Sequence, residues 1–312
     1  MLKQVIEAHE LLDDARIDGK KVSEFLKDSG LGEVSVKRAE GKGKKRATDF
    51  VKVMVPGKEG KKEKGKAPTI GIIGRLGGIG ARPECVGMVS DADGAIAAIS
   101  CALKLADMNC RGDMLKGDVI IATHICPGAP TQPHKPVPFM GSPVDMATMN
   151  RYEVDPAMDA ILSVDTTKGN RIINVRGFAI TPTVKEGWIL KISEDLLDIM
   201  QIVTGKLPVV VPITMQDITP YENGVYHVNS ILQPATATNA PVAGVAITAE
   251  VPVPGCATGA NNLIDIEQAA KFCIEVAKGF GEGKVRFYDK EEFKRLVKLY
   301  GSMNHLLGEQ KG

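Results

Sequence analysis

Apolar and polar positions alternate along the chain in blocks that predict strands and helices in turn. Continuous apolar runs, typical of strands buried on both faces, occupy residues 69–74, 119–123 and 160–165. Further strands are predicted at 34–38 and 50–55, where apolar and polar residues alternate, and at 209–211 and 242–251. Apolar residues at helical spacing occupy residues 3–15, 22–29, 91–108, 196–203, 264–279 and 293–307. This order predicts an α/β fold with a mixed, mainly parallel central sheet and helices on both faces.

The chain shows no internal repeat and no low-complexity linker between two globular parts. Its 312 residues, 44% of them hydrophobic and 25% charged, have the composition of an ordinary globular protein. A chain of this length buries roughly three quarters of its unfolded surface. We therefore expect a single domain over residues 1–312.

The net charge and the N-terminal sequence limit the expected classes of binding partner and the expected cellular location. With 39 basic and 38 acidic residues, the net charge of +1 argues against nucleic-acid and membrane partners. The Lys-rich segments 42–46 and 58–66 contain glycine and no aromatic residue, which is typical of solvated turns. The first 14 residues lack the apolar core of a signal peptide, and the six cysteines show no CxxC spacing. We expect a cytoplasmic protein with a small-molecule or peptide ligand. The sequence is compatible with both a monomer and a homo-oligomer.

Polar and reactive side chains follow several of the predicted buried strands. They are Arg75 after the first, His124 and Cys126 after the second, Asp165 at the end of the third, and Cys256 after a late one. Ligands of open α/β sheets bind outside the carboxyl ends of the strands. The sequence therefore predicts a functional site at this edge.

Some of these side chains are ligand types that zinc uses. His124 and Cys126 are spaced so that both side chains lie on one side of an extended segment. Asp91, before a predicted helix, is either an N-cap or a metal ligand, and Asp165 is either a turn cap or a metal ligand. The glycines of residues 71–80 do not lead into a helix, so we expect no nucleotide.

Taken in order, these segments resemble a known family, the co-catalytic zinc aminopeptidases, most closely their glutamyl-aminopeptidase and endoglucanase-like branch. The resemblance rests on segments 91–98, 160–165 and 238–252 and on the helix from Ile264. It implies a zinc-exopeptidase-like fold, metal ligation by Asp91 and Asp165, and substrate contact by Thr238 and Asn239. The whole chain is also similar to members of an uncharacterised bacterial and archaeal family of about this length.

The chain departs from the aminopeptidase pattern at the metal and catalytic positions. Arg75 stands where the family has a histidine ligand, and the paired glutamates of the family fall near Cys126. The family's last histidine ligand falls near Cys256 or Thr258. Only 15 residues lie between Arg75 and Asp91, which leaves no room for the inserted lid domain of the family.

Three functions follow from these residues. The first is a metal-dependent hydrolase of peptide or N-acyl amino acid amide bonds. Its rebuilt single-metal site, for zinc or another divalent ion, would consist of Asp91, Asp165, His124 and Cys126. His124, Cys126 and Asp93 are the catalytic candidates of this hypothesis.

The second function is that of a pseudoenzyme, a catalytically inactive binder. Arg75 would hold the carboxylate of an amino acid or peptide, beside Thr238, Asn239 and Cys256. The third is a cofactor-independent racemase in which the Cys126 and Cys256 thiols flank a carbon acid.

Overall fold

The computed structural model describes residues 1–41, 47–75, 88–133, 135–212, 230–256 and 259–306. Its main feature is a nine-stranded mixed sheet in the order β1-β2-β4-β3-β7-β11-β9-β10, with β8 also paired to β11. The strands are β1 (Glu33–Glu40), β2 (Ala47–Val55), β3 (Ile70–Gly74), β4 (Val119–Ile125), β7 (Ala160–Thr166), β8 (Gly177–Ile180), β9 (Val184–Lys185), β10 (Trp188–Ile189) and β11 (Val242–Thr248).

The centre of the sheet is parallel and its flanks are antiparallel. Strands β4, β3, β7 and β11 run side by side in one direction, whereas β1, β2, β8, β9 and β10 pair antiparallel with their neighbours. Every residue of β3, β4 and β11 is buried, as their continuous apolar sequences predict. The predicted mixed α/β class is therefore confirmed, with the parallel part confined to the four central strands.

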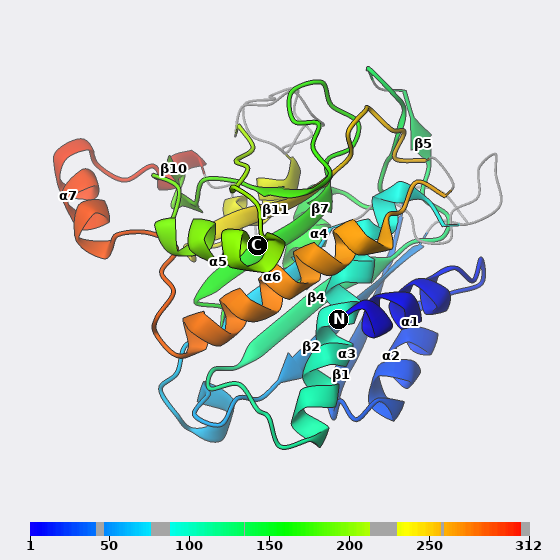
Figure 1. Cartoon of the computed structure of the whole chain (residues 1–312), viewed down its shortest axis with the longest axis horizontal. Helices are drawn as coiled ribbons and strands as arrows, with labels where there is room; N and C mark the ends of the chain where they lie inside the picture. The colour runs from blue at the N-terminus through cyan, green and yellow to red at the C-terminus, as the bar shows by residue number, and fades with distance from the viewer. Residues whose placement is uncertain (42–46, 76–87, 134, 213–229, 257–258, 307–312) are drawn as a thin grey trace.

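Helices cover both faces of the sheet (Figure 1). They are α1 (Leu2–Leu12), α2 (Gly19–Asp28), α3 (Asp93–Cys110), α4 (Met146–Glu153), α5 (Glu194–Thr204), α6 (Leu263–Gly281) and α7 (Lys290–Tyr300). Helices α1, α3 and α6 pack on one face over the larger hydrophobic core. The second face is covered by α4 and by the 3-10 helix η3 (Ser230–Thr236).

Three further 3-10 helices and one small hairpin complete the described elements. The 3-10 helices are η1 (Lys61–Glu63), η2 (Ser90–Ala92) and η4 (Asn304–Leu306), and the hairpin pairs β5 (Thr131–Gln132) with β6 (Phe139–Met140). Helix α4 was not predicted, and residues 209–211 form an isolated bridge through Val210 in place of the predicted strand.

Close packing of α3 on the sheet fixes the start of this helix near the strand ends. A Cβ on Gly74, the last residue of β3, would lie 2.4 Å from the carbonyl oxygen of Gly94 in α3. Glycine is therefore required at this crossing, because any side chain would push α3 away from β3. The packing places Asp93 and the preceding Asp91 close to the carboxyl edge of the parallel strands.

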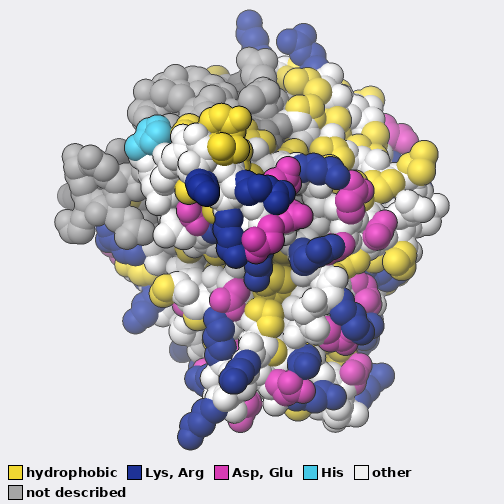
Figure 2. Space-filling view, turned by 90° about the vertical axis from the view of Figure 1, so that its left-hand side faces the viewer, with side chains coloured by type: hydrophobic (Ala, Val, Ile, Leu, Met, Phe, Trp, Pro, Cys, Tyr) yellow, Lys and Arg dark blue, Asp and Glu magenta, His cyan; other side chains and the backbone are white. Residues whose placement is uncertain are grey.

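The outer surface agrees with the balanced charge of the sequence. On the face shown in Figure 2, basic and acidic side chains are interspersed. None of the described helices has the length and apolar character that crossing a membrane would need. Of the Lys-rich segments, residues 42–46 lie outside the described part of the chain, and Lys61 and Lys62 of the second are exposed in η1.

Candidate functional site

The loops that follow the parallel strands meet at one edge of the sheet. The backbone N–H of Arg75 donates to the carbonyl oxygen of Val164 in β7 at 2.7 Å. The hydroxyl of Thr166 donates to the carbonyl oxygen of Ser90 at 2.8 Å, and the N–H of Asp91 donates to that of Gly255 at 3.1 Å. The ends of β3 and β7, the start of α3 and the segment after β11 are thus joined, as the strand-end argument predicted.

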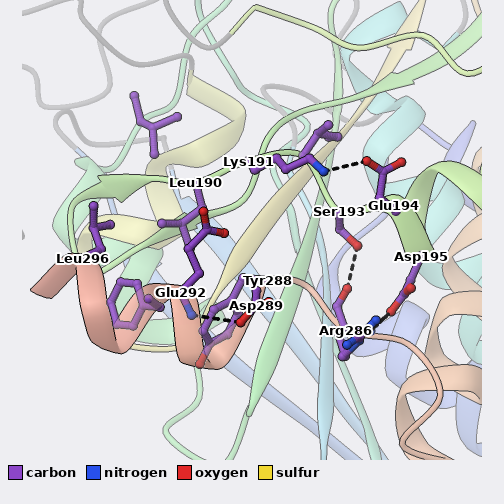
Figure 3. A pocket seen from close by; sticks show the side chains of 13 residues that line it. Leu190, Lys191, Ser193, Glu194, Asp195, Arg286, Tyr288, Asp289, Glu292 and Leu296 are labelled. Carbon is purple, nitrogen blue, oxygen red and sulfur yellow. Dashed lines mark hydrogen bonds and ion pairs between the residues drawn. The ribbon is translucent and has the colours of Figure 1, made fainter.

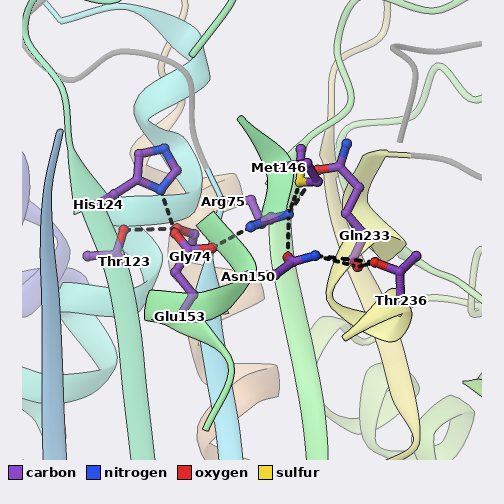
Figure 4. Close-up of polar contacts among 9 residues, drawn as sticks. All are labelled: Gly74, Arg75, Thr123, His124, Met146, Asn150, Glu153, Gln233 and Thr236. Carbon is purple, nitrogen blue, oxygen red and sulfur yellow. Dashed lines mark hydrogen bonds and ion pairs between the residues drawn. The ribbon is translucent and has the colours of Figure 1, made fainter. Parts of the chain in front are cut away.

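Arg75 lies at the centre of a buried polar network (Figure 4). Its side chain is 4% exposed, and Nη1 donates to the carboxylate of Glu153, the last residue of α4. Nη2 donates to Gln233 Oε1 at 2.8 Å, to Asn150 Oδ1 at 3.3 Å and to Met146 Sδ at 2.9 Å. The guanidinium therefore joins β3 to α4 and η3.

Glu153 also binds His124, which lies near the carboxyl end of β4. Its Oε1 is 2.5 Å from His124 Nδ1, and both side chains are buried. Burial alone would raise the pKa of Glu153, but Arg75 and His124 outweigh it and hold this pKa below its ordinary value. Because an ionised carboxylate only accepts hydrogen bonds, Nδ1 of His124 carries the hydrogen and donates the hydrogen bond to Glu153.

A second buried ion pair lies at the end of β7. Lys168 Nζ donates to the carboxylate of Asp93 and, at 2.9 Å, to the carbonyl oxygen of Ala260. Asn261 Nδ2 donates to the other oxygen of Asp93 at 2.6 Å. Burial raises the pKa of Asp93, and Lys168 and Asn261 only partly offset this. Both carboxylate oxygens of Asp93, a predicted catalytic residue, are therefore bound by side chains of the protein itself.

Asp91 holds three segments together. Its carboxylate oxygen Oδ2 accepts from the N–H of Met140 at 2.9 Å, and its own N–H donates to Gly255. A Cβ on Gly255 would lie 2.4 Å from that same oxygen, so only glycine fits there. Asp165, at the end of β7, accepts from the N–H of Thr166 at 2.7 Å.

The predicted zinc ligands do not form a metal site in this structure. Across the described residues, which include Asp91, Asp165, His124 and Cys126, no three His, Cys, Asp or Glu side chains are arranged to hold a metal ion. Nδ1 of His124 binds Glu153, and the buried Arg75 cation binds the same carboxylate. A second cation at close range would be repelled by this guanidinium.

The residues predicted to contact a substrate lie at opposite ends of the parallel strands. Arg75, expected to bind a carboxylate ligand, binds the carboxylate of Glu153. Thr238 and Asn239 precede β11 and so lie toward the amino ends of the parallel strands, where Ala240 N–H donates to Thr238 Oγ1 and Lys185 donates to the Asn239 carbonyl oxygen. The structure does not bring these two residues to the carboxyl edge.

The sequence argument missed Glu153 and Lys168. A signal for the helix that carries Glu153 was present, because Asp145 is an N-cap residue and its side chain accepts from Thr148 N–H. Nothing in the sequence shows that Glu153 would face Arg75 from 78 residues away. Lys168 is three residues beyond Asp165, but a buried lysine cannot be recognised without its partner.

A surface cavity of about 370 Å³ lies away from these residues (Figure 3). It is lined by residues 189–195, by the start of α7 and by Arg286. Its main charges are paired, Lys191 with Glu194 at 2.9 Å and Arg286 with Asp195 at 3.2 Å. None of the predicted site residues lines it, so we do not assign the chemistry to this cavity.

The fold is similar to that of known enzymes. The solved structure "Bottromycin maturation enzyme BotP in complex with Mn" matches with a TM-score of 0.51 and 14% identity, over 87% of this chain and 70% of that one. The Legionella pneumophila LapA aminopeptidase matches with a TM-score of 0.47 and 12% identity, over 89% of this chain and 71% of that one. The first likeness shows the fold, and the predicted zinc-exopeptidase-like architecture is confirmed.

Sequence comparison gives the family. No curated protein matches the chain. A family model described as "Protein of unknown function (DUF1177)" matches residues 39–310, most of the sequence. The chain therefore belongs to the DUF1177 family.

Proposed function

We propose that this protein hydrolyses an amide bond in a small peptide or an N-acyl amino acid, with His124 as the general base. The observation that carries the proposal is the 2.5 Å contact between His124 Nδ1 and Glu153 Oε1 at the carboxyl edge of the sheet. A carboxylate at Nδ1 fixes the tautomer and the orientation of an imidazole, so the lone pair of the neutral ring is at Nε2. The likeness in fold to the manganese-bound maturation enzyme BotP supports an enzymatic role.

The charges around His124 suit proton transfer. Nε2 takes a proton from water as the water oxygen attacks the amide carbonyl, and the ring becomes an imidazolium. The ionised Glu153 stabilises this imidazolium, and Arg75 keeps Glu153 ionised. The ring then donates the proton to the leaving nitrogen as the carbon–nitrogen bond breaks. General acid–base catalysis of this kind contributes typically about 10²–10⁴-fold to a rate.

Burial sets a condition on the mechanism. His124 is 1% exposed, and its Nε2 edge points away from Glu153 in Figure 4. A substrate therefore reaches Nε2 only when a neighbouring segment moves.

The metal question is separate from this step. The predicted ligands do not converge among the described residues, so we route no step through a divalent ion. Zinc or manganese content of the purified protein, and activity after treatment with a chelator, test this choice. Stoichiometric metal together with activity that a chelator abolishes and Mn²⁺ or Zn²⁺ restores would contradict water activation by His124 alone.

The main test is amine release from a panel of dipeptides and N-acetyl amino acids. We expect His124→Gln to lower kcat by about 10²–10⁴-fold on the substrate that the wild type cleaves. His9→Gln in α1, away from the strand ends, is the matched control and should leave kcat unchanged. Circular dichroism checks that both variants are folded. Wild-type activity that survives in His124→Gln, or amine release from none of the substrates, would overturn the proposal.

A further inference from the structure

Three sulfur-containing side chains share one small cluster at the carboxyl edge. Cys126 and Met140 are buried in this cluster with Val89 and Ala129, and the half-buried Cys256 packs against it. We call Cys126, Met140 and Cys256 the sulfur cluster. Its members come from the end of β4, from β6 and from the segment after β11, which are far apart in the sequence. The proposed amide hydrolysis uses none of them.

Hydrogen bonds hold the segments of Met140 and Cys256 in fixed positions. Met140 N–H donates to Asp91, Asp91 N–H donates to the carbonyl oxygen of Gly255, and Gly255 N–H donates to that of Pro138 at 3.1 Å. Residue 255 must be glycine because the Asp91 carboxylate fills the space of its Cβ. The segments that carry Met140 and Cys256 are therefore anchored on one residue, which is the preorganisation that a binding site needs.

The ligand chemistry of the sulfur cluster is that of a soft metal ion. Thiolate and thioether sulfur select Cu(I) over hard cations. A bound cation offsets the negative charge of thiolate ligands.

From this arrangement we infer that the sulfur cluster binds one Cu(I) ion through Cys126, Cys256 and Met140. Each thiol that becomes a ligand releases one proton to solvent, so binding is tighter at higher pH. The tetrahedral sites of zinc need four ligands, and the described residues supply no group of three His, Cys, Asp or Glu. Cu(I) is bound well by thiolate and thioether ligands, which are the ligand types of this cluster.

The test is anaerobic titration of the full chain with Cu(I) in competition with bathocuproine disulfonate. We expect one Cu(I) per chain. Cys256→Ser and Cys126→Ser should weaken binding by more than about 100-fold, beyond the range for residues outside the ligand shell, and Met140→Leu by about 10-fold. Cys110→Ser, at an exposed free thiol, is the matched control and should bind as the wild type does.

X-ray absorption at the copper edge covers the case in which Cys126→Ser does not fold. The wild-type spectrum should show sulfur as the only neighbouring atom type. Nitrogen or oxygen neighbours, no retained Cu(I), or unchanged binding in both cysteine variants would each overturn the inference. His124→Gln should bind Cu(I) as the wild type does, so failure of this proposal is distinguishable from failure of the proposed hydrolysis.

Discussion

Two carboxylates of this protein are equally buried and have opposite shifts in pKa. Glu153 and Asp93 both have 0% exposed surface. Glu153 lies between Arg75 and His124, and its pKa is lowered. Asp93 has a single cationic partner, Lys168, with the neutral Asn261, and its pKa is raised. Burial pushes both values up. Arg75 and His124 outweigh it at Glu153, whereas Lys168 and Asn261 do not outweigh it at Asp93.

The two carboxylates therefore have different roles: Glu153 is a charged group, and Asp93 links segments of the structure. Glu153 stays ionised, which lets it orient and stabilise His124. Lys168 and Asn261 also bind backbone carbonyls, those of Ala260 and Val89. The group around Asp93 therefore ties the end of β7 to the start of α3 and to the segment before α6, and its carboxyl group can take up a proton.

The largest effect is expected from Glu153→Gln. This change keeps the shape of the side chain and leaves the buried Arg75 without a counter-charge, and arginine cannot lose its proton. Loss of one partner of a buried ion pair costs about 3–5 kcal/mol. We expect a fall of that size in the free energy of unfolding, measured by urea denaturation at pH 7.

Asp155→Asn is the control for this change. Asp155 lies two residues from Glu153 and pairs with Lys52 at 3.0 Å, but both side chains are more than a quarter exposed. A pair that water reaches contributes about 0–1 kcal/mol. An equal loss in the two variants would mean that the Arg75–Glu153–His124 network contributes no more than an ordinary surface pair.

Lys168→Met should have a smaller effect than Glu153→Gln, although it also removes one partner of a buried pair. Asp93 can become neutral by taking up a proton, so the cost is that of a poorly satisfied polar group, about 1–3 kcal/mol. The loss should shrink as the pH falls from 7 to 5, because protonation of Asp93 then becomes easier. Urea denaturation at both pH values measures this, and a loss that grows toward pH 5 would contradict the raised pKa of Asp93.

The fold was predictable from sequence because it rests on local patterns. The runs at 69–74, 119–123 and 160–165 became the central strands β3, β4 and β7 within one or two residues. The strand-end argument also located Arg75, His124 and Asp165 at one edge. Helix α4 was missed because only three of its eight residues are buried and its apolar positions are few, so its hydrophobic pattern is weak.

The partners of the site residues were not predictable, since they depend on contacts between distant parts of the chain. His124 looked like a zinc ligand because an imidazole at a strand end is equally suited to a metal and to a carboxylate. Glu153, 29 residues away on α4, supplies a carboxylate to Nδ1 of this ring. The sequence around Asp93 does not indicate that Lys168, 75 residues away, would be its partner. A charged residue in the sequence shows its charge but not what neutralises it.

The smallest effect is expected in the acid range, where the two carboxylates should act with opposite signs. The pKa of Glu153 is lower in the folded state, so its stabilisation is complete above the unfolded value of about 4.3 and is lost as the pH falls through the folded value. The pKa of Asp93 is higher in the folded state, so its contribution is complete below about 3.9 and is lost as the pH rises through the folded value.

Urea denaturation from pH 3 to pH 6 tests this, with Glu153→Gln and Asp93→Asn each compared with the wild type. One proton changes the free energy of unfolding by at most about 1.4 kcal/mol per pH unit. The wild type should lose its advantage over Glu153→Gln as the pH falls, and should gain relative to Asp93→Asn over the same range. Slopes of the same sign would mean that their partners do not shift the pKa values of these two buried carboxylates in opposite directions.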